Sequence, residues 1–101
     1  MDATVTLYVN SGILKAGDRE VLLSPQETRI LEILARHHGF FVSQDRVIMA
    51  LYGDHEPESA TSATRVAVFH LRKKIALLGC GIETKKGSGW RSHPKIGIVR
   101  A

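Results

Sequence analysis

Short apolar stretches broken by turn residues occupy the first quarter of the chain. Three runs rich in Val, Leu, Ile, Thr and Tyr span Thr4–Val9, Gly12–Ala16 and Arg19–Leu23. The segments Asn10-Ser11-Gly12 and Gly17-Asp18 separate them. Runs of this length, bounded by glycine, asparagine and aspartate, are typical of β-strands joined by tight turns. The pattern predicts a small antiparallel β-meander.

The spacing of apolar residues changes to that of a helix directly after Leu23. Ser24 can cap a helix, Pro25 suits its first position, and Glu27 completes an S-x-x-E capping box. The apolar residues that follow at helical spacing are Ile30, Leu31, Ile33 and Leu34. Gly39 is a typical stop signal. We therefore predict a first helix that begins after Ser24 and ends before Gly39.

A second helix is predicted after a short apolar segment, Phe40–Val42, which fits a strand or an extended connector. Ser43 provides the start of this helix, and Gly53 provides its end. Its apolar positions are Val47, Ile48, Leu51 and Tyr52. The next residues, Gly53–Ala60, are polar and acidic, and Pro57 prevents the helix from continuing. They predict a loop.

The third predicted helix, from Thr61 to Leu78, has two different faces. At about 100° per residue, one side collects Thr64, Val68, Leu71, Ile75 and Leu78. The opposite side collects Ser62, Arg65, Val66, Phe69 and Lys73, with Arg72 on the flank. One face is therefore suited to a core, and the other offers cations, a hydroxyl group and an aromatic ring to a partner.

A basic hairpin is predicted directly after this helix. Ile82–Lys86 and Trp90–Ser92 are short extended runs, and Gly87-Ser88-Gly89 forms a turn between them. An N-terminal meander, three helices and a C-terminal hairpin define an α+β fold of the winged helix-turn-helix type. We place this domain at residues 1–92 and a tail at 93–101, which adds an edge strand, supports a dimer or is disordered.

Charge is unevenly distributed along the chain. The 101 residues carry a net charge of +4. Residues 1–61 hold five Lys or Arg against nine Asp or Glu, whereas residues 62–101 hold nine against one. The two parts thus carry −4 and +8, and the excess is concentrated on the third helix and the hairpin. Such a concentration indicates a polyanionic partner, and duplex DNA is the leading candidate.

Composition limits the other function classes. A chain with 44% hydrophobic residues and a single cysteine, Cys80, fits one small core without an internal disulfide. We find no apolar run of membrane-spanning length and no signal peptide, so we expect a cytoplasmic protein. No catalytic motif is recognisable, and His37-His38 gives only a faint metal signal because neighbouring helical residues point about 100° apart. We expect no enzyme activity, cofactor or metal.

The motifs occur in the order and spacing of a known family. They are Leu23-Ser24-Pro25-Gln26-Glu27 with Arg29–Leu34, Val42-Ser43-Gln44-Asp45 leading to Leu51-Tyr52-Gly53, Leu71-Arg72-Lys73-Lys74-Ile75, and Ile82-Glu83-Thr84 with Gly87–Arg91. Over residues 5–92 the chain resembles the OmpR/PhoB-type effector domains of bacterial two-component response regulators. The resemblance implies that the third helix enters the major groove, that the wing reaches the minor groove, and that the loop between the second and third helices contacts RNA polymerase.

The chain also departs from this family. No receiver domain precedes it, so we expect either an excised effector domain or a regulator controlled in another way. Ala63-Thr64-Arg65-Val66-Ala67 replaces a common Thr-Val-Asp-Val-His run, and Phe69 and His70 stand where basic residues are frequent. Thr28 replaces a usual aromatic core residue. The DNA sequence that is recognised cannot be transferred from relatives.

Chemistry assigns roles to the individual side chains. Arg65 is the first candidate for base recognition because its guanidinium can bond bidentately to guanine. Ser62 can bond a base or a phosphate, and Phe69 can pack on a thymine methyl group. The candidates for phosphate or wing contacts are Ser43, Thr61, Arg72, Lys73, Lys85, Lys86 and Arg91. The candidates for the polymerase-contacting loop are Asp54, Glu56 and Glu58.

Several alternatives stay open at this stage. Phe69 either faces DNA or packs against the wing, and Trp90 is expected to anchor the hairpin on the core. Arg72 either reaches phosphate or pairs with a carboxylate such as Glu27 or Glu32, while Lys74 is either solvated or bound to phosphate. Two other functions remain: a protein-interaction module acting on RNA polymerase or another regulator, and an RNA-binding domain. A homodimer on DNA is also compatible with the sequence.

Overall fold

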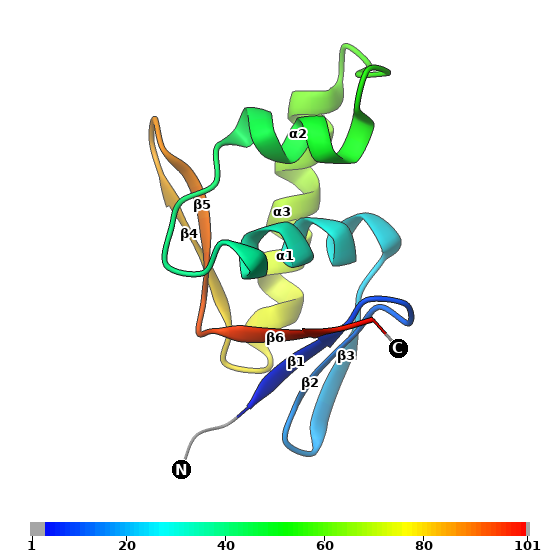
Figure 1. The fold of residues 1–101 in the computed structure, drawn as a ribbon, viewed down its shortest axis with the longest axis vertical. Helices are drawn as coiled ribbons and strands as arrows, with labels where there is room; N and C mark the ends of the chain where they lie inside the picture. The colour runs from blue at the N-terminus through cyan, green and yellow to red at the C-terminus, as the bar shows by residue number, and fades with distance from the viewer. Residues whose placement is uncertain (1–3, 101) are drawn as a thin grey trace.

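The computed structural model describes residues 4–100 and forms one elongated body with principal extents of 43 × 26 × 20 Å. Three helices, α1 (Pro25–Arg36), α2 (Gln44–Tyr52) and α3 (Ala60–Ala76), lie between an N-terminal sheet and the loop that joins α2 to α3 (Figure 1). A two-stranded hairpin, β4 (Gly81–Lys85) and β5 (Gly89–His93), runs along one side. The predicted winged helix-turn-helix is confirmed.

The N-terminal sheet contains the three predicted strands and one more. β1 (Val5–Tyr8), β2 (Ile13–Ala16) and β3 (Arg19–Leu22) form the antiparallel meander. β6 (Ile96–Val99) pairs in parallel with β1, which gives the order β3-β2-β1-β6. Of the possibilities for the residues after the hairpin, the structure has the edge strand, and β6 lies in the same sheet as the first residues described.

Helix α1 begins as the capping box predicted. The Ser24 hydroxyl accepts a hydrogen bond from the Glu27 backbone N–H at 3.1 Å, and the Glu27 carboxylate accepts one from the Ser24 N–H at 2.8 Å. The buried hydroxyl of Thr28 donates to the Ser24 carbonyl at 2.9 Å. Two donors at the helix start are thereby satisfied, which fixes where α1 begins on the sheet.

The core lies where the sheet, α1 and α3 meet. Its completely buried apolar side chains come from these three elements and from α2: Leu7, Leu14, Ile30, Leu31, Leu34, Val47, Leu71 and Ile75. The predicted inner face of α3 is confirmed within the helix, since Thr64, Val68, Leu71 and Ile75 are at most 2% exposed. Leu78, also predicted for this face, lies beyond the end of α3 and is half-buried. With this face buried, the opposite stripe of α3 is presented to solvent.

The hairpin is fastened to the helices through Val42 and Trp90. Val42 N–H donates to the Trp90 carbonyl at 2.7 Å, and Trp90 N–H donates to the Val42 carbonyl at 2.9 Å. The Trp90 side chain is 5% exposed, so its predicted role as the anchor of the hairpin is confirmed. Gly89 makes this approach possible, because an added Cβ would lie 1.9 Å from the Val42 carbonyl oxygen.

Candidate nucleic-acid interface

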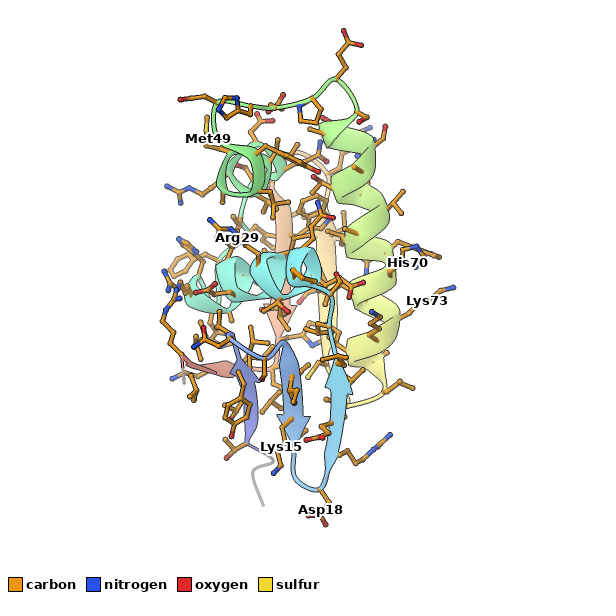
Figure 2. All side chains as sticks on the ribbon, turned by 90° about the vertical axis from the view of Figure 1, so that its right-hand side faces the viewer. Lys15, Asp18, Arg29, Met49, His70 and Lys73 are labelled. Carbon is orange, nitrogen blue, oxygen red and sulfur yellow. The ribbon has the colours of Figure 1, made fainter. Side chains whose placement is uncertain are left out.

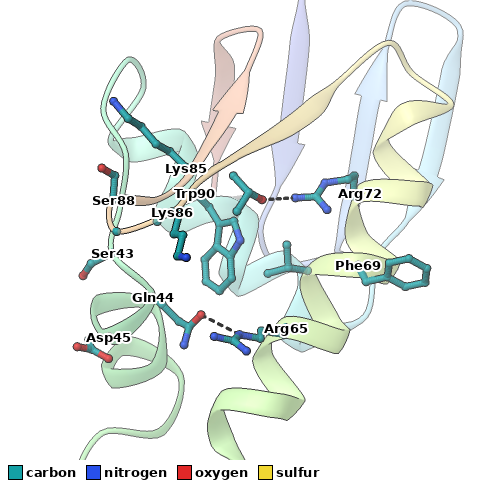
Figure 3. A pocket seen from close by; sticks show the side chains of 14 residues that line it. Ser43, Gln44, Asp45, Arg65, Phe69, Arg72, Lys85, Lys86, Ser88 and Trp90 are labelled. Atoms are coloured by element: carbon teal, nitrogen blue, oxygen red, sulfur yellow. Dashed lines mark hydrogen bonds between the residues drawn. The ribbon is translucent and has the colours of Figure 1, made fainter.

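A cleft of about 640 Å³ lies between the first turn of α2, the middle of α3 and the hairpin. It brings together side chains that are up to 47 positions apart in the sequence. The polar and charged ones that matter most are Ser43, Gln44, Arg65, Arg72, Lys85 and Lys86 (Figure 3). Asp45 is the only carboxylate among the described residues that line it. The cleft therefore has a surplus of positive charge.

Arg65 crosses from α3 to α2. Its Nε donates to the Gln44 side-chain oxygen at 3.1 Å (Figure 3). Gln44 is the first residue of α2, directly after the N-cap Ser43, whose hydroxyl accepts from the Arg46 N–H at 3.1 Å. The hydrogen bond orients the guanidinium, and in the part of the chain described its two terminal nitrogens have no protein partner.

Arg72 is held by the wing. Its Nε donates to the Ile82 carbonyl at 3.1 Å, and Nη2 donates to the Thr84 hydroxyl at 2.7 Å. The alternative that Arg72 pairs with Glu27 or Glu32 is wrong, because cations from other positions already bind both carboxylates. Arg72 thus ties α3 to β4 and lies at the back of the cleft.

Lys74 makes the contact with Glu27 that was considered for Arg72. Its ammonium lies 2.7 Å from Glu27 Oε1, so it is neither simply solvated nor turned toward the cleft. Burial would raise the pKa of the Glu27 carboxyl, but the hydrogen bonds from Lys74 and from the Ser24 backbone N–H outweigh it. The pKa of Glu27 is therefore lowered, and this ion pair joins α1 to α3.

Phe69 is exposed. The packing of Phe69 against the wing, one of two sequence alternatives, is wrong: the ring is 49% exposed and points away from the hairpin (Figure 3). The Lys73 ammonium lies 4.5 Å from the ring centroid, and His70 meets the ring edge-on at 5.5 Å. His70 and Lys73 project from α3 on the side away from α1 and α2 (Figure 2). The exposed stripe of α3 thus combines a cation with an aromatic surface.

The cations of the hairpin differ in their surroundings. Lys85 and Lys86 are exposed at its turn. Arg91 forms a two-point ion pair with Glu83 at 2.9 and 3.0 Å, and its guanidinium lies 4.4 Å from the Phe41 ring centroid. Lys85 lies 5.8 Å from the same centroid. In the free protein, Lys85 and Lys86 are therefore more available to an anion than Arg91 is.

The remaining candidates lie around this surface. Thr61 is half-buried in the first turn of α3, and Ser62 is exposed. Ser62 lines a separate shallow groove toward the start of α1, together with Val66 and His70. Ser62 therefore lies at the edge of the exposed stripe that is farther from the wing.

The acidic side chains of the α2–α3 loop, Asp54, Glu56 and Glu58, are all exposed. They stand at the end of the molecule opposite the N-terminal sheet (Figure 1). Among residues 4–100 there is no cluster of His, Cys, Asp or Glu suited to hold a metal ion, and no helix is both long and apolar enough to cross a membrane.

Sequence reasoning missed three residues of this site. Gln44 orients Arg65, Thr84 accepts from Arg72, and Phe41 lies under Arg91 and Lys85. A signal existed only for Gln44, which follows an N-cap and therefore belongs to the exposed first turn of α2. The contacts of Thr84 and Phe41 depend on how the hairpin packs, which no local pattern specifies.

Comparison with known proteins supports the same fold over nearly the whole chain. Residues 18–92 match the family described as "Transcriptional regulatory protein, C terminal". Response regulator protein GraR of Staphylococcus aureus (strain MRSA252) is 39% identical over 94 residues, which are 91% of this chain. The chain spans only 41% of the length of GraR.

Solved structures give a similar result. The C-terminal domain of the nisin resistance regulator NsrR, a lantibiotic response regulator, is 33% identical, with a TM-score of 0.76 over 90% of this chain and 93% of that one. The response regulator AdeR DNA-binding domain, solved in complex with an intercistronic region, shares the fold at 16% identity. Its TM-score is 0.66 over 90% of this chain and 95% of that one. With the family match and these relatives, the chain belongs to the OmpR/PhoB-type DNA-binding domains, the C-terminal domains of transcriptional regulatory proteins.

Proposed function

We propose that the chain regulates transcription in the bacterial cytoplasm by binding a specific sequence of double-stranded DNA, with α3 in the major groove and the β4–β5 wing at the adjacent minor groove. One observation carries the proposal: the cleft gathers cations from α3 and the wing beside the polar start of α2. Four of the nine cations in residues 62–101, Arg65, Arg72, Lys85 and Lys86, thus line one cleft. We expect no catalytic activity from such a module.

The dimensions of α3 suit this docking. Its 17 residues span roughly 25 Å, and a helix with its side chains is about 10–12 Å wide. The major groove of B-DNA is about 12 Å wide and admits a helix. The inner face of α3 is occupied by the core, so the exposed stripe faces the bases when α3 lies in the groove.

We assign base recognition to three side chains of the exposed stripe of α3. Arg65 is oriented by Gln44 and presents its terminal nitrogens, which suits the O6 and N7 acceptors of guanine. Phe69 offers an apolar surface to a thymine methyl group, and Ser62 offers a hydroxyl to a base or a phosphate at the edge of the stripe. The lack of a core role for any of the three supports these assignments.

The residues proposed to contact phosphate lie around these three side chains. Lys85 and Lys86 at the turn of the wing and Lys73 on α3 are exposed cations that can reach a DNA backbone. Arg72 and Arg91 donate to side chains of β4, so they position the wing as well as adding positive charge. Ser43 and Thr61 lie in or beside the first turns of α2 and α3, where free backbone N–H groups favour phosphate.

We propose that the acidic α2–α3 loop contacts RNA polymerase. We also propose that two copies of this domain bind adjacent half-sites on DNA. Exposure of Asp54, Glu56 and Glu58 at one end of the molecule supports the first proposal. This loop stands at the end of the molecule opposite the N-terminal sheet, so it is free to meet a protein while α3 lies on DNA (Figure 1). The same exposure favours the competing function, a protein-interaction module that acts on RNA polymerase or another regulator without DNA.

Two substitutions test the DNA proposal. Binding sites are first selected from a random duplex library, and fluorescence anisotropy then measures Kd on a selected and a scrambled duplex at several salt concentrations. Arg65→Ala is expected to weaken selected-site binding by about 1–3 kcal/mol and to affect the scrambled duplex far less. Lys85→Ala is the matched comparison: it is expected to weaken both duplexes similarly and to reduce the salt slope by about one.

Two results would contradict the proposal at different levels. Equal losses for Arg65→Ala on both duplexes would refute its role in base recognition while leaving DNA binding intact. An absence of salt-sensitive binding to any duplex would refute DNA binding itself and would favour the protein-interaction module.

A further inference from the structure

A second cavity, of about 550 Å³, lies along α1 and shares no residue with the DNA interface. Its walls are one stripe of α1, the turn between β1 and β2, and Ala50 near the end of α2. Three arginines line it, Arg29, Arg36 and Arg100, and we call it the arginine groove. Arg29 lies on the opposite side of the molecule from His70 and Lys73 (Figure 2).

The arginine groove carries more positive than negative charge. Glu32, 8% exposed, is the only carboxylate among the described residues that line it. Arg36 Nη2 lies 2.8 Å from Glu32 Oε2, and Arg100 Nη2 contacts the same oxygen. Two guanidinium groups therefore share one carboxylate oxygen, and with Arg29 the groove has a net charge of +2.

Arg29 contributes a charge that no carboxylate of the described chain neutralises. Its Nε and Nη2 donate to the Ala50 carbonyl at 3.3 and 3.1 Å, which holds the guanidinium at the α2 side of the groove. Arg36 stands seven residues further along α1, roughly 10 Å away. Arg100 is positioned from the other wall, where the Asn10 side-chain amide donates to its carbonyl at 3.0 Å.

Apolar side chains form the floor between these cations. Leu23 is 4% exposed, and Val9 and Ile33 are partly buried against the core. The volume of this cavity lies within the range of small-molecule sites. A guanidinium matches a carboxylate in shape as well as in charge, because its N–H groups can donate to both oxygens.

We propose that the arginine groove binds a small organic carboxylate with an apolar body. The carboxylate lies against Arg36 and Arg100, where it competes with Glu32 for their N–H groups, and the body lies on Leu23, Val9 and Ile33. Arg29 adds a second positive charge along the groove. Such a ligand bridges the N-terminal sheet and α1 on the side of the molecule away from the exposed stripe of α3.

The test is a titration of the ¹⁵N-labelled protein at constant ionic strength with three probes: benzoate, benzyl alcohol and inorganic phosphate. Benzoate is expected to shift, in a saturable way, the backbone amide signals of Gly12, Ile33 and Arg36. Benzyl alcohol lacks the charge and phosphate lacks the apolar body, so both are expected to bind at least about tenfold more weakly. Equal binding of phosphate, or no saturable shift with benzoate, would overturn the proposal.

Substitutions locate the site. Arg36→Gln is expected to weaken benzoate binding about tenfold, because one charge-assisted hydrogen bond is lost. Arg46→Gln is the matched control, since Arg46 is an exposed arginine on α2 outside the groove, and it is expected to leave the affinity unchanged. Glu32→Gln is expected to strengthen binding several-fold by releasing both arginines. Unchanged affinity in Arg36→Gln, with a native amide spectrum, refutes the site.

Discussion

Replacing Gly89 by alanine tests how the wing is attached. An alanine Cβ at this position would lie 1.9 Å from the Val42 carbonyl oxygen and 2.6 Å from its carbon, both of them backbone atoms. The hairpin must move away from Val42, and the two hydrogen bonds between Val42 and Trp90 are then lost. Each contributes about 0.5–1.5 kcal/mol.

Backbone strain adds to this loss. Gly89 has a φ of 110°, in the region that side-chain-bearing residues avoid, at a cost of about 1–2 kcal/mol. The expected loss in the free energy of unfolding for Gly89→Ala is therefore about 2–5 kcal/mol. A domain of this size has about 5–15 kcal/mol in total, so the variant is near the limit of stability.

Gly87 offers a matched control in the same turn. It also has a positive φ, 86°, but an added Cβ there would meet no atom within 4 Å. Gly87→Ala is expected to cost only the backbone strain, about 1–2 kcal/mol. Urea unfolding followed by circular dichroism and by Trp90 fluorescence measures both variants. Equal destabilisation by the two would refute the argument that close approach to Val42 requires a glycine.

Three further predictions concern individual side chains. The pKa of Glu27 is lowered in the folded state. The contribution of the ionised carboxylate to stability is therefore present above its unfolded pKa of about 4.3 and is lost as pH falls through the folded value. The Tm difference between wild type and Glu27→Gln should shrink in acid, and a constant difference would contradict this role. Burial raises the pKa of the Cys80 thiol, so alkylation at mildly alkaline pH should be slow in the native protein and fast in urea, and equal rates would contradict its burial. Glu83→Gln should release Arg91 and lower the Kd for both a selected and a scrambled duplex at low salt, as measured by fluorescence anisotropy. An unchanged or higher Kd would show that the ion pair does not restrain Arg91.

Local sequence signals predicted most elements of this fold well, because α1 and α2 carry their own N-caps and glycines follow all three helices. The capping box at Ser24, the N-cap at Ser43 and the glycines after each helix act within a few residues. The third helix begins at Ala60 and ends at Ala76, close to the expected Thr61 and Leu78. Periodicity also separated the buried from the exposed face of this helix correctly.

Contacts between distant segments were not predictable in the same way. The parallel pairing of β6 with β1 depends on the whole fold, so the sequence left three possibilities for the last residues. The choice of partners among the charged residues also failed: Glu27 binds Lys74, and Arg72 binds Thr84 and the Ile82 carbonyl. Many cations compete for few carboxylates, and only the packing of α3 against α1 and the wing decides among them.

The pairing of β1 with β6 also determines the order in which the molecule can be assembled on the ribosome. Val5 faces Ile96, and the Asn10 side chain bonds the Arg100 carbonyl 90 positions later. The contacts that join the helices and the wing, such as Val42 with Trp90 and Glu27 with Lys74, span about half of that separation and are complete earlier in synthesis. The four-stranded sheet can close only once residue 99 has left the exit tunnel, and closing so long a loop carries an entropic cost that slows folding. β6, which is synthesised after the helices and the wing, therefore completes the sheet that β1 began.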